Sequence, residues 1–173
     1  MSRPSGPATL RRTERISSRA QGGLLLLPAL LAACAGAPEG TGRAGADPAA
    51  EISAMLHASA ESWNAGDLDG FLDDYLDSPE TVFAGGSGVI RGVDAIRDRY
   101  LETYWRTGAP EHALRFEDLE VSALGADHAL ALGRYVLSDR ATDSAAASGV
   151  FTLVLRRTPE GWRIIHDHSS AAP

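Results

Sequence analysis

Hydrophobic residues recur at helical spacing in the part of the chain that follows residue 46. Asp47 and Pro48 form a helix start, because Asp can cap the first turn and Pro suits the first helical position. The stripe that follows ends at Asn64–Gly66, where glycine can adopt the left-handed conformation that closes a helix. Its members are Ile52, Met55, Leu56, Ser59, Ala60 and Trp63. This spacing predicts a first helix that begins at Pro48.

Two further helices and a short hairpin are expected next. Asp67 is the cap of a second helix that ends before Pro79, and residues 93–104 form the third. Between them, the segment "TVFAGGSGVIRG" predicts a hairpin that turns at residues 85–88. The apolar stripe of the second helix consists of Leu68, Phe71, Leu72, Tyr75 and Leu76.

After residue 112 the hydrophobic period changes from helical to two, which is typical of strands. The turns "GAD" and "TPEG" and a longer polar loop separate the apolar runs. The predicted strands cover residues 113–121, 129–138, 149–157 and 162–169. Helices followed by a run of antiparallel strands indicate an α+β fold, in which a curled sheet with helices across its concave face encloses one pocket.

Three segments of this pattern resemble a known superfamily. They are "WNAGDLDGFLDDYLDSPETVF", "GVIRGVDAIRDRY" and "GVFTLVLRRTPEGWRIIHDHSS". They are similar to the nuclear transport factor 2-like superfamily, and within it to the SnoaL-like branch, which is related to ketosteroid isomerases. The resemblance implies a cone over residues 47–170, with a curved antiparallel sheet and about three helices on its concave face. Because this fold carries many activities, it does not by itself name one.

The isomerase branch of that superfamily allows a check of single positions. Its general base would fall near Ala84, its oxyanion-binding Tyr near Ser59, and its second acid within the segment "VFTL", residues 150–153. None of these positions supplies the group that the reaction needs, namely a base within reach and donors at the oxyanion. Isomerase activity is therefore not expected.

The closing segment "GWRIIHDHSS" carries the candidate chemistry. Strict alternation would place Trp162, Ile164, His166, His168 and Ser170 on one face of the last strand, with Asp167 on the other. His166 and His168 are then candidates for an acid/base role or for a metal pair. Zinc needs three or four protein ligands and this pair supplies two, so no metal site is expected. No other cofactor is expected either. The predicted pocket residues are Trp63, Tyr75, Tyr104, Tyr135, His166, His168 and Ser170.

Charge narrows the choice of partners. The formal net charge is −7, and the first 33 residues contribute +4 to it, so the remainder carries −11. A nucleic-acid partner is not expected, because phosphate binding needs a concentrated basic surface. Arg97, Arg99, Arg156 and Arg157 could bind an anionic substrate, but pairing with the many surface acids is the simpler interpretation.

The N-terminal region predicts export and a lipid anchor. A basic flank precedes the apolar run "GGLLLLPALLAAC", which is shorter than the roughly 20 residues of a membrane-spanning helix and fits a secretory signal. "LAAC" resembles the bacterial lipobox, which implies cleavage after residue 33 and lipidation of Cys34. Residues 34–46 form a flexible tether of mainly Ala, Gly and Pro. An extracytoplasmic, membrane-anchored location follows.

Three functions remain open from the sequence. The first is a domain that binds a small, mostly apolar molecule in a conical pocket. The second is a protein-interaction module whose pocket is filled by its own side chains. The third is an enzyme of the cyclase, dehydratase or hydrolase type that uses a His as acid or base. Apolar residues on both faces of residues 149–157 also predict a homodimer through the outer face of the sheet.

Overall fold

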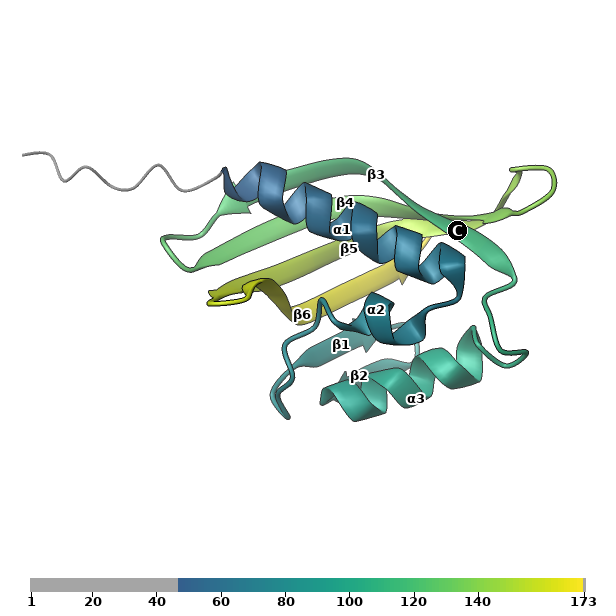
Figure 1. Cartoon of the computed structure of the whole chain (residues 1–173), viewed down its shortest axis with the longest axis horizontal. Helices are drawn as coiled ribbons and strands as arrows, with labels where there is room; N and C mark the ends of the chain where they lie inside the picture. The colour runs from purple at the N-terminus through teal and green to yellow at the C-terminus, as the bar shows by residue number, and fades with distance from the viewer. Residues whose placement is uncertain (1–46, 173) are drawn as a thin grey trace, which may run out of the picture. The chain divides into compact units, whose positions relative to one another are not determined.

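The computed structural model of the chain describes residues 47–172 (Figure 1). The predicted signal peptide, lipidation site and tether, residues 1–46, lie outside these residues. The elements are α1 (Pro48–Ala65), α2 (Leu68–Leu72), β1 (Val82–Gly85), β2 (Gly88–Arg91), α3 (Val93–Thr103), β3 (His112–Ala123), β4 (His128–Asp139), β5 (Ala145–Thr158) and β6 (Gly161–Ala171). This order confirms the expected α+β fold. No helix within the described range has the length and apolar character needed to cross a membrane.

The six strands form a single curved sheet in the order β2-β1-β6-β5-β4-β3. Strands β3 to β6 follow one another as antiparallel neighbours, whereas β1 pairs with β6 in parallel. The helices all lie on one side of the sheet, with α1 running across the long strands and α3 beside the β1–β2 hairpin (Figure 1). The sheet therefore has one face toward the helices and one outer face.

The first helix has the ends that the sequence predicts. The Asp47 side chain accepts a hydrogen bond from the backbone N–H of Ala49, at 3.1 Å. Gly66 closes the helix with a φ of 79°, in the left-handed region that glycine adopts without strain. Asn64 in the last turn donates to the carbonyl of Leu114 and accepts from its N–H, at 2.9 and 2.8 Å. The end of α1 is thus attached to β3.

The second helix is shorter than its apolar stripe predicts, because it ends at Leu72 rather than near residue 77. The next residues pair with β6 instead: the N–H of Leu76 donates to the carbonyl of Ile164, and the N–H of Ile164 donates to the carbonyl of Asp74. Tyr75 lies between them in a single bridge to Ile164. This pairing with a distant strand outweighs helix propensity and holds Tyr75 beside β6.

Aromatic side chains dominate the core between α1 and the sheet. The ring of Trp63 meets the rings of Phe71, Tyr104 and Trp105 in edge-to-face contacts, with centroids 4.7–5.2 Å apart. Its indole N–H donates to the carbonyl of His112 at 2.9 Å, which satisfies the polar atom of a nearly buried side chain. Trp63 therefore links α1 to β3 and to the aromatic cluster of the core.

Candidate functional site

A cavity of about 320 Å³ lies between the concave face of the sheet and the helices. Its walls are mainly apolar and aromatic side chains from the helices and from β1, β3, β4 and β5, among them Leu114, Phe151 and Leu153. Gly86, Ser87 and Ala171 also line it and are exposed, so the cavity opens to solvent at that side. Its volume is at the lower end of the range of about 300–1,000 Å³ found for ligand pockets.

A β-bulge in β6 determines which residues face this cavity. Leu155 pairs with Ile164 and Val154 pairs with His166, so Ile165 is the extra residue on β6. An extra residue reverses the alternation of side chains beyond it. Ile164 and Asp167, which strict alternation would place on opposite faces, are both buried at 4% and 5% exposure. The predicted face assignment of β6 is therefore wrong beyond Ile165.

The bulge moves three predicted pocket residues to the outer face of the sheet. His166, His168 and Ser170 are not among the residues that line the cavity. His168 and Ser170 are exposed and pair with Thr152 and Val150 of β5. An acid/base role for either His inside the cavity is incompatible with this register. The other predicted pocket residues, Trp63, Tyr75, Tyr104 and Tyr135, do line the cavity.

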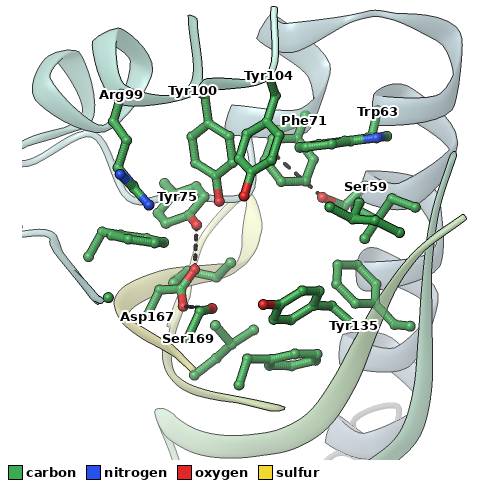
Figure 2. A pocket seen from close by; sticks show the side chains of 18 of the residues that line it. Ser59, Trp63, Phe71, Tyr75, Arg99, Tyr100, Tyr104, Tyr135, Asp167 and Ser169 are labelled. Carbon is green, nitrogen blue, oxygen red and sulfur yellow. Dashed lines mark hydrogen bonds between the residues drawn. The ribbon is translucent and has the colours of Figure 1, made fainter. Parts of the chain in front are cut away.

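Asp167 takes the place inside the cavity that the two His were expected to hold. Its Oδ2 accepts a hydrogen bond of 2.6 Å from the Tyr75 hydroxyl, and its Oδ1 accepts one of 2.9 Å from Ser169 (Figure 2). Burial raises the pKa of Asp167, while these two bonds and the charges of the neighbouring His residues lower it. The net shift is upward, so the cavity contains a carboxyl group that holds its proton more tightly than an exposed Asp.

Three more tyrosines surround this carboxyl group. Tyr100 and Tyr104 reach down from α3 and its C-terminal end, with their hydroxyls directed toward Tyr75 and Asp167 (Figure 2). Tyr135 extends from β4 on the opposite wall (Figure 2). Burial raises the pKa of Tyr100, and the nearby charge of Asp167 raises it further. The Tyr100 hydroxyl therefore stays protonated, and all three hydroxyls can act as hydrogen-bond donors in the cavity.

The four arginines considered from the sequence have different surroundings. Arg97 pairs with Asp69, and Arg157 pairs with Glu51. Arg156 is exposed on β5. Arg99 is the one cationic side chain among the described residues that line the cavity. Pairing with surface acids thus accounts for Arg97 and Arg157, but it does not account for the position of Arg99 at the cavity.

Comparison with known proteins identifies the fold and the family. The family model described as "SnoaL-like domain" matches residues 52–173. The chain belongs to the SnoaL-like family. The predicted resemblance is therefore confirmed, and the family match covers nearly the whole region that the structure describes. A search of curated proteins gave no match to this SnoaL-like chain.

Solved structures with the same fold support this assignment. A nuclear transport factor 2-like protein of unknown function from Shewanella oneidensis MR-1 is 27% identical, with a TM-score of 0.62 over 72% of this chain and 99% of that one. A ketosteroid isomerase-like protein from Erwinia carotovora atroseptica is 22% identical, with a TM-score of 0.58 over 75% and 100% of the two chains. A protein of unknown function with a cystatin-like fold from Nostoc punctiforme is 16% identical, with a TM-score of 0.60 over 72% and 90%. At these identities the last two show the fold alone.

The SnoaL-like cavity obtains its acid and its tyrosine hydroxyls from positions other than those checked for isomerases. Ser59 lines the cavity, and so do Phe151 and Leu153 of the segment "VFTL", whereas Ala84 does not. The acid comes from β6, and the nearest hydroxyl comes from the segment after α2. The comparison of single positions therefore could not identify Asp167 and Tyr75 as the polar pair of this cavity.

Asp167, Ser169 and Arg99 are among the polar lining residues that sequence reasoning did not place in the cavity. The one sequence feature that accompanies the bulge is the pair Ile164-Ile165, two adjacent large apolar residues where alternation expects one. Such a pair also occurs in strands that are buried on both faces, so it does not identify a bulge by itself. Within residues 47–172, no three His, Cys, Asp or Glu side chains are grouped as metal ligands.

Proposed function

We propose that this SnoaL-like domain binds a small, mostly apolar molecule in the cavity between the helices and the sheet. The observation that carries the proposal is a buried carboxyl group in an open cavity whose walls are mainly apolar and aromatic. Protein cores are normally packed without cavities of this size. Burying a carboxyl group costs free energy, so a purely structural role for it in a core is uncommon. Asp167, with Tyr75 fixed against it, is therefore best explained as the polar anchor for a bound molecule.

The anchor suits a ligand that carries a hydrogen-bonding group on an apolar body. Asp167 can donate a hydrogen bond when it is protonated and accept one when it is ionised. Tyr100 and Tyr104 add donors on the same side of the cavity (Figure 2). The ring of Phe116 and the side chain of Leu153 offer apolar surface. Few polar groups among many apolar ones are the usual composition of a small-molecule site.

Binding of a neutral aromatic probe tests this proposal. N-phenyl-1-naphthylamine, whose fluorescence rises in apolar surroundings, is titrated into the full chain carrying Cys34→Ser, so that no detergent is needed. Ala171→Trp places a large ring on the inward face at the cavity mouth and is expected to reduce binding at least tenfold. Leu101→Trp, an exposed position on α3 outside the cavity, is the matched control and should leave binding unchanged. Equal binding by all three proteins would contradict the proposal.

The same proposal includes attachment to the membrane. The basic flank, the apolar run and Cys34 support a lipidated, extracytoplasmic protein held by a tether of residues 34–46. An apolar ligand is most concentrated at a membrane, so a binding domain tethered there meets it more often. The Cys34 variant described in the Discussion tests the anchor separately from the cavity.

We also propose that two copies associate through the outer face of the sheet. Leu132 of β4 is 40% exposed and Val150 of β5 is 55% exposed on neighbouring strands of that face. Light scattering should give the mass of a dimer, and Val150→Glu should give a monomer. Leu124→Glu, in the turn between β3 and β4, is an equally exposed control that should leave the dimer intact. A monomeric unmodified protein would overturn the idea. The interaction-module alternative expects a filled pocket, which the cavity does not favour.

A further inference from the structure

We propose that Arg99 recognises an anionic group, such as a carboxylate, on the molecule that the cavity binds. This inference rests on the proposed binding function and narrows it to a class of ligand: amphipathic acids with an apolar body. It follows from the position of Arg99, from its lack of an acidic partner, and from the chemistry of the groups around it.

Arg99 is fixed at the cavity wall near the open side. Its side chain extends from α3 toward Tyr75 and Tyr100 (Figure 2). One guanidinium nitrogen donates to the Ser87 hydroxyl at 3.0 Å, and its central carbon lies 5.1 Å from the centre of the Phe83 ring. The bond and the ring restrict the guanidinium group, so less entropy is lost when it binds an anion.

Six of the ten arginines within residues 47–172 form no ion pair with a carboxylate, and Arg99 is the one of these six that lines the cavity. Among the described residues, four arginines form ion pairs with Asp or Glu, and Arg99 is not one of them. The four are Arg97, Arg115, Arg134 and Arg157. A chain as acidic as this one has many carboxylates that could pair with it. The guanidinium group instead keeps most of its donors available at the cavity.

Asp167 does not serve as the counter-ion of Arg99. Both of its oxygens already accept hydrogen bonds, from Tyr75 and from Ser169. Burial also raises the pKa of Asp167, which lessens the negative charge that a bound anion would face. Because both Asp167 oxygens are already engaged, the donors of Arg99 stay available to an anion that enters the cavity.

These positions define how the ligand would lie. Its anionic group binds Arg99 near Ser87, where the cavity opens and the charge keeps part of its hydration. Its apolar body fills the interior, against Phe116, Phe151 and Leu153. A charged group at the mouth avoids the large cost of burying an unpaired ion.

A pair of probes that differ by one anionic group tests the inference. 8-Anilinonaphthalene-1-sulfonate and N-phenyl-1-naphthylamine share the same aromatic body, and only the first carries a sulfonate. Both are titrated into the full chain with Cys34→Ser, and into the same chain with Arg99→Gln, Arg99→Lys or Arg97→Gln. Arg97→Gln removes the same charge from the same helix, but its side chain pairs with Asp69 outside the cavity, so it controls for net charge.

Arg99→Gln is expected to weaken binding of the sulfonate probe about tenfold, because a hydrogen bond to a charged group is lost, and to leave the neutral probe within about twofold. Arg99→Lys should recover part of the loss, and Arg97→Gln should lose nothing. If Arg97→Gln and Arg99→Gln weaken the sulfonate probe equally, or neither does, the inference fails while the cavity proposal stands. If Ala171→Trp does not reduce binding of the neutral probe, the cavity proposal itself fails. Thermal unfolding of each variant shows whether a loss of binding reflects a loss of fold.

Discussion

The bond between Tyr75 and Asp167 offers the sharpest test of how the cavity is built. Tyr75→Phe removes one oxygen and keeps the ring, so the packing around it is unchanged. The lost bond is short, at 2.6 Å, and both side chains are only 5% exposed. A buried hydrogen bond to a charged group contributes about 1.5–3 kcal/mol, and a neutral one about 1 kcal/mol. The free energy of unfolding should therefore fall by about 1–3 kcal/mol, depending on the charge of Asp167.

The pH dependence has a definite sign. Burial raises the folded-state pKa of Asp167 above its ordinary 3.8, so the unmodified protein loses stability as the pH rises from the ordinary value through the raised one. The Tyr75 hydroxyl stabilises the ionised carboxylate, and its removal raises the pKa further. The destabilisation by Tyr75→Phe should therefore grow as the pH rises through the pKa of Asp167.

Urea denaturation of both proteins, at several pH values from about 4.5 to about 9, measures this effect. Tyr135→Phe is the matched control, since Tyr135 lines the same cavity and its hydroxyl makes no hydrogen bond with the described residues. Its free energy of unfolding should stay within about 0.5 kcal/mol of the unmodified value. If Tyr75→Phe behaves like Tyr135→Phe, or if its effect shrinks as the pH rises, the assignment of Asp167 as a buried, proton-retaining anchor is wrong.

Three further predictions concern other parts of the chain. Burial raises the pKa of Asp74 to about 6, so the unmodified protein should lose stability as the pH rises from about 4 to about 6. Asp74→Asn should remove this loss and raise the free energy of unfolding above pH 6 by at most about 3 kcal/mol, measured by urea denaturation. An unchanged pH profile would contradict this prediction. Asn64→Ala removes both side-chain bonds to Leu114 and should lower the free energy of unfolding by about 1–3 kcal/mol, so a change below about 0.5 kcal/mol would show that α1 needs no such attachment. Cys34→Ser should move the protein from the membrane fraction to the soluble fraction or leave its precursor uncut, and unchanged membrane association would refute lipid anchoring.

The parts of the fold that sequence predicts well are those with local causes. The beginning of α1 depends on Asp47 and Pro48, and its end depends on Gly66, all of which act through their own backbone neighbours. The strands follow from a period of two that persists over many residues, and their observed limits differ by only a few positions. The family resemblance added the curvature of the sheet and the position of the helices, which no single segment encodes.

The parts that sequence missed have distant causes. Tyr75 fits the apolar stripe of a longer second helix, and only the pairing of neighbouring backbone groups with Ile164 ends that helix early. Asp167 occupies an outward position under strict alternation, and only the register between β5 and β6 turns it inward. The residues near Tyr75 and Asp167 in the sequence do not indicate which strand each of them will pair with.

These two departures together create the candidate site. Ile164 pairs with the segment after α2 and thereby places Tyr75 over β6, and the extra residue that follows, Ile165, turns Asp167 toward the same side. A regular strand would have directed His166 and His168 into the cavity in place of Asp167. Bulges and interrupted helices weaken local hydrogen bonding, so they persist where the surrounding structure fixes them. The pairing at Ile164 and the bulge at Ile165 are adjacent on β6, and the two side chains that they position, Tyr75 and Asp167, meet in a hydrogen bond of 2.6 Å. This coincidence is the strongest structural argument for the proposal that Tyr75 and Asp167 serve a ligand rather than the fold.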